Sequence, residues 1–193
     1  MVSPDTLQIL NESERHQSYV QSLAVCRETS QVISTCSNGV VYSLDIETLS
    51  DLHTIYKDGV SKKGVTASGP YLAIGDSDGQ VLILETKGSE PVLCMPISSD
   101  GIASILGNSP KGRIFTADLN GHIQEWNLSP VYPLSATEVG EPIRAIASSC
   151  SSDVLAACCA DKIRVFVRAS AINRYRDYLS HIRWQRSILQ IAY

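Results

Sequence analysis

The chain has 193 residues and a formal net charge of −4 at pH 7, with 44% hydrophobic and 19% charged residues. This is the balance of an ordinary globular protein, and it excludes a disordered or fibrous chain before residue 168. The first 20 residues hold no apolar run long enough for a secretory signal, and no stretch approaches the roughly 18 apolar residues of a membrane span. We therefore expect an intracellular protein of the cytoplasm, the nucleus or both. Its acidic body is not expected to bind nucleic acid by itself.

Three similar dipeptides, Asn38-Gly39, Asp78-Gly79 and Asn120-Gly121, recur about every 40 residues. Each lies between two strand-like runs, which predicts a tight hairpin in which both turn residues take positive φ. A shorter turn at Asp161-Lys162 separates a fourth pair of runs. A repeat of this length is typical of propellers and other repeat folds.

Each repeat supplies four candidate strands. Two of them flank the turn, where unbroken apolar runs predict strands that are covered on both faces. Short apolar stretches are candidates for the innermost strand, at 20–25, 64–67, 102–106 and 143–148. Stretches at 52–56, 91–97 and 131–137 supply the fourth strand, and the prolines of the last two suit an outer edge; residues 6–10 could complete the fourth repeat. Four strands per unit predict the blade of a propeller.

The chain resembles the WD40 repeat family over about residues 5–168. The resemblance rests on the Gly-x-Ile/Val pattern after the turns and on Trp126-Asn127, which stands where the family closes a repeat with Trp-Asp. It implies an all-β fold, a β-propeller of WD40 type, with repeats at about 5–50, 51–90, 91–130 and 131–168. Ser34 and Thr116 match strand hydroxyl groups of the family. Because no Gly-His dipeptide precedes any repeat, we expect the family's buried His, Asp, Ser/Thr and Trp network not to form.

Only four blades are recognisable, whereas ring closure in this family usually takes seven. A closed four-blade ring and an open arc are both compatible with the sequence, and we expect the open arc. Such an arc would belong to a longer protein, a shortened isoform or an oligomer. Its first and last blades would expose apolar faces, which self-association or a second propeller fragment would have to cover.

The chain changes character from Arg168 onward, where five arginines stand against one aspartate. Apolar residues near helical spacing predict a basic amphipathic tail over 169–193, either helical or irregular. The tail could pack on the last blade, be unrelated to the fold, or bind an acidic partner, a membrane surface or nucleic acid. Its candidate contact residues are Arg174, Arg176, Arg183, Trp184 and Arg186.

Few residues match a motif for metal binding or catalysis. The six cysteines lack metal-ligand spacing, so we expect mostly small buried residues in a reducing compartment, with the adjacent Cys158 and Cys159 on opposite faces of a strand. The segment 76–79 is similar to the opening of a calcium loop, but Lys87 stands at the twelfth position, and the repeat alignment makes this segment a hairpin turn. The four histidines lie in different repeats, outside any catalytic motif. We expect no enzyme, no metal and no cofactor.

The resemblance implies a non-catalytic scaffold or adaptor that mediates protein–protein interactions within a multi-subunit complex. A peptide or subunit would bind the loops that link the outer strand of one blade to the inner strand of the next. The candidate contact residues in these loops are Lys57, Lys62, Lys63, Asp100, Glu138 and Glu141.

Two alternatives remain open. A propeller-type enzyme, lactonase- or quinoprotein-like, would assemble its site across blades. A substrate adaptor for ubiquitin ligation is a narrower form of the scaffold interpretation. Some WD40 adaptors carry an arginine shortly after Trp-Asp, but Ser129 occupies that place here.

Overall fold

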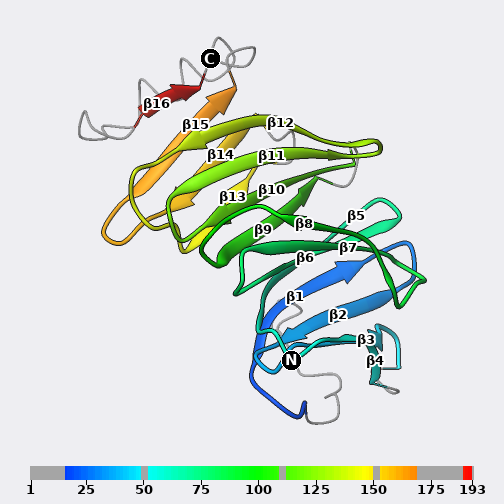
Figure 1. The fold of residues 1–193 in the computed structure, drawn as a ribbon. Coiled ribbons are helices and arrows are strands. Elements are labelled where there is room, and N and C mark those ends of the chain that lie inside the picture. Colours follow the sequence, from blue (N-terminus) through cyan, green and yellow to red (C-terminus); the bar gives the residue numbers. More distant parts are fainter. Residues whose placement is uncertain (1–15, 49–51, 109–111, 150–152, 169–188, 193) are drawn as a thin grey trace, which may run out of the picture.

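The computed structural model describes residues 16–48, 52–108, 112–149, 153–168 and 189–192. These residues form four sheets of four strands each, and they contain no helix (Figure 1). The strands of each sheet neighbour one another in chain order, and the sheets follow one another along the chain. The all-β prediction and the prediction of a four-stranded repeat are confirmed.

The strand bounds follow the repeats. The first sheet contains β1 (Val20–Cys26), β2 (Gln31–Cys36), β3 (Val40–Asp45) and β4 (His53–Lys57). The second contains β5 (Lys62–Ser68), β6 (Tyr71–Asp76), β7 (Gln80–Glu85) and β8 (Pro91–Pro96). The third contains β9 (Ile102–Asn108), β10 (Arg113–Asp118), β11 (His122–Leu128) and β12 (Val131–Glu138). The fourth contains β13 (Ala145–Ser148), β14 (Val154–Cys158), β15 (Ile163–Arg168) and β16 (Leu189–Ala192). Sheets and sequence repeats are offset by one strand, because each outer strand pairs with the strand before it and so joins the sheet of the preceding repeat.

The turns between the second and third strands differ from the prediction. Gly39, Gly79 and Gly121 have φ of 82°, 78° and 91°, but the Asn or Asp before each glycine does not have positive φ. Each glycine N–H donates to the carbonyl three residues earlier, at 3.2, 3.4 and 3.3 Å. The expectation of two residues with positive φ is therefore wrong. These hairpins use the longer turn in which a single glycine takes the left-handed conformation.

Neighbouring sheets pack through their inner strands, β1 against β5, β5 against β9 and β9 against β13. Apolar side chains from facing sheets interdigitate, so that Ile33 packs with Val65 and Ile74, and Phe115 packs with Ile146. No comparable contact joins the first sheet to the fourth in the described ranges, and Figure 1 shows these sheets at opposite ends of the molecule. The described residues thus form an arc of stacked sheets, in which no ring is closed.

The outer edge of the fourth sheet differs from the prediction. Its last strand is β16, which runs parallel to β15, with Val165 opposite Leu189. The expectation of an entirely helical or irregular tail is therefore wrong for residues 189–192. The partner of β15 comes from the C-terminal side and not from residues 6–10, which lie outside the described residues. Residues 169–188, where the helix was predicted, also lie outside them.

Candidate functional site

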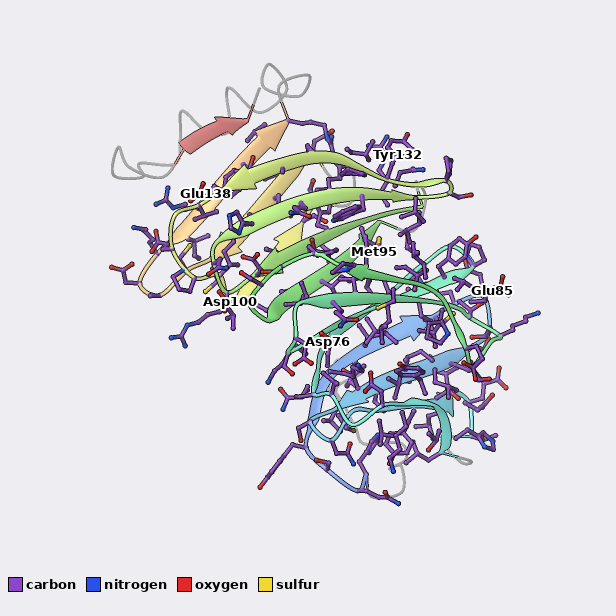
Figure 2. The ribbon with its side chains drawn as sticks, in the orientation of Figure 1. Asp76, Glu85, Met95, Asp100, Tyr132 and Glu138 are labelled. Atoms are coloured by element: carbon purple, nitrogen blue, oxygen red, sulfur yellow. The ribbon has the colours of Figure 1, made fainter. Side chains whose placement is uncertain are left out.

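The hairpin turns and the linking loops between sheets meet along one edge of the arc. We call this the turn edge and define it by residues 37–39, 77–79 and 119–121 of the turns and 57–63, 97–101 and 138–144 of the loops. Backbone bonds connect turn to loop, from Ser77 N to Ser61 O at 2.9 Å and from Leu119 N to Gly101 O at 3.1 Å. In Figure 2, Asp76, Asp100 and Glu138 lie on this side, and Glu85 and Tyr132 lie at the opposite ends of the strands.

The turn glycines allow the loops to approach closely. A Cβ at Gly39 would lie 2.6 Å from the backbone nitrogens of Gly59 and Val60. A Cβ at Gly79 would collide with the carbonyl oxygen of Ser98, and one at Gly121 would lie 2.5 Å from the carbonyl oxygen of Glu141. Each turn therefore lies directly against the loop that leads into the next sheet.

Two buried aspartates fix the turns of the second and third sheets. Asp76 Oδ1 accepts hydrogen bonds from the amides of Asp78 (3.0 Å) and Gln80 (2.9 Å). Asp118 Oδ1 does the same for Asn120 (3.0 Å) and His122 (2.8 Å). Because Asp76 and Asp78 belong to a hairpin turn, the interpretation of this segment as a turn is confirmed.

The second carboxylate oxygen of Asp118 lies 3.1 Å from His122 Nδ1. Burial by itself raises the pKa of Asp118, but hydrogen bonds from Ser98 and His122 favour the ionised carboxylate more strongly. The net effect is a pKa below the ordinary value of an aspartate. This aspartate is therefore held ionised at the turn edge.

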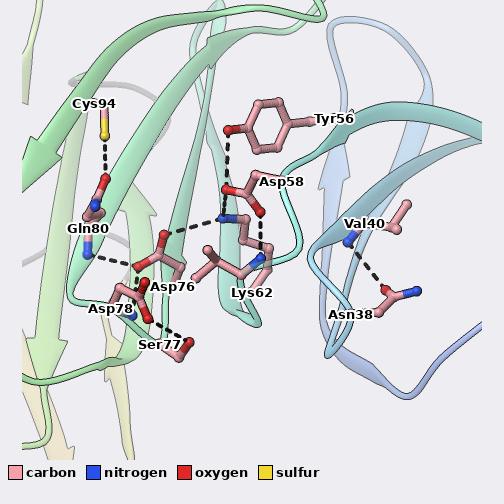
Figure 3. A network of polar contacts seen from close by, with 11 residues as sticks. Asn38, Val40, Tyr56, Asp58, Lys62, Asp76, Ser77, Asp78, Gln80 and Cys94 are labelled. Carbon is pink, nitrogen blue, oxygen red and sulfur yellow. Dashed lines mark hydrogen bonds and ion pairs between the residues drawn. The ribbon is translucent and has the colours of Figure 1, made fainter.

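The corresponding oxygen of Asp76 faces a buried lysine (Figure 3). The Lys62 side chain is fully buried, and its Nζ lies 3.3 Å from Asp76 Oδ2 and 2.6 Å from Asp58 Oδ2. Tyr56 Oη donates to the same Asp58 oxygen at 3.3 Å, and the Lys62 Nζ lies 5.5 Å from the Tyr56 ring centroid. Burial, followed by the negative charge of Asp58, raises the pKa of Tyr56 to about 12.

The six predicted contact residues of the loops all fall on the turn edge, but they differ in exposure. Lys57, Lys63, Asp100 and Glu138 are exposed. The expectation that Lys62 is exposed is wrong, because its side chain is buried and its ammonium group pairs with Asp58 and Asp76. The candidates of the tail, Arg174, Arg176, Arg183, Trp184 and Arg186, lie outside the described residues.

Glu141 is only partly available to a partner. Its Oε1 accepts from Lys162 Nζ at 2.8 Å and from Arg164 Nη2 at 2.9 Å. The hydrogen bonds from Lys162 and Arg164 hold the pKa of Glu141 below its usual value. Its carboxylate therefore ties the last linking loop to β15.

Three other carboxylates of the turn edge are exposed to solvent. Asp78, Asp100 and Glu138 are exposed, and no Lys, Arg or His of the described ranges forms an ion pair with them. The sequence prediction included Asp100 and Glu138 but not Asp78, which it treated only as a turn residue. The repeat alignment could have identified Asp78, because it occupies the tip of the second turn.

Two single contacts, in different sheets, involve the residue types of the His, Asp, Ser/Thr and Trp network. His16 Nε2 lies 2.8 Å from Ser34 Oγ, and its ring makes an edge contact with Tyr42 at 5.2 Å between centroids. Trp126 Nε1 donates to Thr116 Oγ1 at 3.4 Å. A histidine thus reaches the strand hydroxyl group of the first sheet, and a tryptophan reaches that of the third. The sequence prediction missed His16 because no glycine precedes it.

The buried carboxylate of Glu125 links the third and fourth sheets. Glu125 is 3% exposed, and its Oε1 accepts from Arg168 Nη2 at 2.8 Å and from Arg113 Nη1 at 3.2 Å. Burial raises the pKa of Glu125, but the two arginines outweigh this effect and lower it overall. This contact strengthens the junction and does not form part of the turn edge.

The cysteine prediction is confirmed in part. Cys26, Cys36 and Cys159 are buried, Cys94 and Cys158 are exposed, and these five cysteines are free thiols. Cys158, the last residue of β14, is exposed, whereas Cys159, which follows the strand, is buried. Nowhere in the described ranges do three His, Cys, Asp or Glu side chains gather to hold a metal. The same part of the chain has no helix with the length and apolarity needed to cross a membrane.

The geometry defines a class, an all-β protein built from successive four-stranded sheets. Among solved structures, the chain is similar to the crystal structure of the computationally designed Ika4 protein, with a TM-score of 0.70 and 17% sequence identity. The match covers 84% of this chain and 99% of that chain. At this identity the likeness shows the fold alone. No protein-family model and no curated protein matches the sequence.

Proposed function

We propose that the chain is a divergent WD40-like scaffold without catalytic activity, which binds other proteins through the turn edge. The observation that carries the proposal is the set of exposed carboxylates at Asp78, Asp100 and Glu138 on turns and loops that buried side chains hold in place. Loops on a rigid framework are the usual place for recognition, because the framework reduces the ordering cost of binding.

The rigidity of the edge comes from the contacts beneath it. Asp76 and Asp118 each bind two backbone amides of a turn, and Lys62 joins Asp76 to the loop that carries Asp58. The partner therefore meets a surface whose backbone is largely pre-formed. Asp76 pairs with Lys62, and Asp118 binds the turn amides and His122, so these buried carboxylates have structural partners, and this supports the scaffold interpretation over the enzyme alternative.

The charges indicate the chemistry of the partner. The middle of the edge presents Asp78, Asp100 and Glu138, and Lys57 and Lys63 are exposed beside the first linking loop. A segment with Lys or Arg opposite the carboxylates would gain complementary contacts and faster association. We infer that the partner is a peptide or subunit with a basic segment.

The experiment is a selection of peptides on the purified chain from a displayed library, followed by affinity measurements on the selected sequences. The test variant is Asp100→Lys with Glu138→Lys, which reverses two exposed charges of the turn edge. The matched control is Glu85→Lys with Glu90→Lys, two exposed carboxylates at the opposite end of the strands. Reversing the charges of an interface rim changes affinity mainly through association.

We expect selected peptides rich in Lys and Arg, with an affinity that falls at least about tenfold for the turn-edge variant and less than about twofold for the control. Equal losses for the two variants would reject the turn edge as the binding surface. A library that yields no peptide with saturable binding would reject peptide recognition by this chain.

A further inference from the structure

One position of the inner strand is buried in three sheets and exposed in the first. The four residues at this position, one in each sheet, are equivalent because they pair with equivalent residues of the second strand. These partners are Ser34, Ile74, Thr116 and Ala157. The exposed fractions at this position are 63% for Leu23, 4% for Val65, 8% for Ile105 and 9% for Ile146. In the other three sheets the preceding sheet covers this position. Among the described residues, no sheet covers Leu23 in this way.

The third strand contains a position that is buried in the first three sheets and exposed in the fourth. Its equivalent residues pair with Thr35, Gly75, Ala117 and Cys158. The exposed fractions are 0% for Val41, 0% for Val81, 5% for Ile123 and 47% for Ile163. In the first three sheets this side chain packs on the next sheet, so Ile163 is the uncovered residue of the fourth.

These residues belong to two apolar faces at the ends of the arc. The leading face, on the first sheet, contains Leu23, Val25 and Val32, of which Leu23 and Val25 are more than half exposed. The trailing face, on the fourth sheet, contains Ala145, Ala147, Ala156, Cys158 and Ile163, all exposed or half-buried. Alternation along the strands places these residues opposite the side that packs on the third sheet.

The two faces are the separated halves of an interface that the chain already contains three times. In each internal junction, the side equivalent to the trailing face packs on the side equivalent to the leading face. A trailing face is therefore of the kind that packs on a leading face. A surface of this kind on a repeat protein must be capped or paired.

We propose that the covering partner is a second copy of the chain, joined head to tail at both ends. The leading face of each copy would pack on the trailing face of the other, so that two equal junctions continue the internal stacking. Head-to-tail contacts form closed rings when the rotation closes. Two copies give eight sheets, the upper end of the range of about four to eight blades in propellers, whereas three copies would exceed it. This inference does not depend on the proposed function of the turn edge.

The test is the mass of the intact chain by sedimentation equilibrium over a range of concentrations. We expect twice the 21.0 kDa of one chain, with dissociation below about 1 μM. Two variants, Leu23→Glu and Ile163→Lys, each place a charge on one face. The control is Val92→Glu, which changes an equally exposed residue of β8 on neither face. Circular dichroism verifies the fold of each variant.

Each face variant alone should be monomeric, because both junctions of its dimer contain the substitution, and the control should remain dimeric. An equimolar mixture of the two variants should regain the dimer mass, because one of its junctions has two unaltered faces. A variant that fails to fold could not be rescued in this way. A wild-type monomer at about 100 μM would overturn the proposal. So would a mass above that of a dimer, or a dimer that only one of the two variants abolishes.

Discussion

Lys62 and Asp76 lie opposite each other in β5 and β6, and their charged groups are 3.3 Å apart in the interior of the second sheet. The lysine also reaches Asp58 in the preceding loop, so a single ammonium group connects the inner strand, the turn and the linking loop. Within the described residues, neither carboxylate forms an ion pair with any other cation. The stability of this part of the turn edge therefore depends on one buried charge.

Replacement of this lysine tests the cluster. We expect Lys62→Met to lower the free energy of unfolding by about 3–5 kcal/mol, because it leaves a buried carboxylate uncompensated. Adding Asp76→Asn should restore about half of the loss, since the amide oxygen can still accept the hydrogen bonds from Asp78 and Gln80. Urea unfolding at a fixed protein concentration measures each value. The exposed Lys63→Met is the control, and an equal loss for Lys62 and Lys63 would refute the account of this cluster.

The close approach of turn and loop predicts a large loss of stability when Gly79 is replaced. Gly79→Ala combines the strain of positive φ with a collision against the Ser98 carbonyl, so we expect a loss of about 2–4 kcal/mol. Gly69→Ala has positive φ but nothing within 4 Å of the new methyl group, and we expect about 1 kcal/mol. Thermal unfolding compares the two variants. Equal losses would mean that the loop moves aside without cost.

The pKa of Glu125 predicts a loss of stability in acid. Its folded-state pKa is lowered by Arg168 and Arg113, so the stabilisation is present above the unfolded pKa of about 4.3 and is lost as the pH falls through the folded value. Glu125→Gln removes this contribution, and we expect it to cost about 2 kcal/mol at pH 7 and much less in the acid range.

The measurement is the free energy of unfolding of both proteins between pH 7 and about pH 3. Glu138→Gln serves as the control, because this exposed carboxylate has no ion pair with a described residue. A constant difference between wild type and Glu125→Gln over the whole range would show that the charge of Glu125 does not act through its two arginines.

Equivalent positions of the inner strand should respond differently to truncation. Ile105→Ala removes a side chain that fills the junction between the second and third sheets, and we expect a loss of about 3 kcal/mol. Leu23→Ala should cost less than about 1 kcal/mol at protein concentrations below those of any self-association. Chemical unfolding of dilute protein compares them, and similar losses would contradict the difference in burial.

Much of the fold could be predicted from local patterns. The turn glycines and the apolar runs on both sides of them placed the strands within a few residues, because a hairpin depends on residues that are close in sequence. The conformation of Asn38 and its equivalents was predicted wrongly. An Asn-Gly pair is compatible with turns of different length, and the dipeptide by itself does not select among them.

The site was less predictable, because its contacts depend on register. In the sequence, Lys62 belongs to a lysine-rich segment of the kind expected in an exposed loop, and only its pairing with β6 places it beside Asp76. Likewise, His16 reaches Ser34 across 18 positions of sequence. The position of an Asp directly before the turn, shared by Asp76 and Asp118, was the signal that could have indicated a buried acceptor in two repeats.

The turn edge as a binding surface is tested most directly by hydrogen–deuterium exchange of the chain with and without a selected basic peptide. We expect slower exchange in the linking loops at 57–63, 97–101 and 138–144, and unchanged exchange in the turns at 46–48 and 86–90 at the other end of the strands. Protection confined to those opposite turns, or to β1 and β15 at the ends of the arc, would contradict the account.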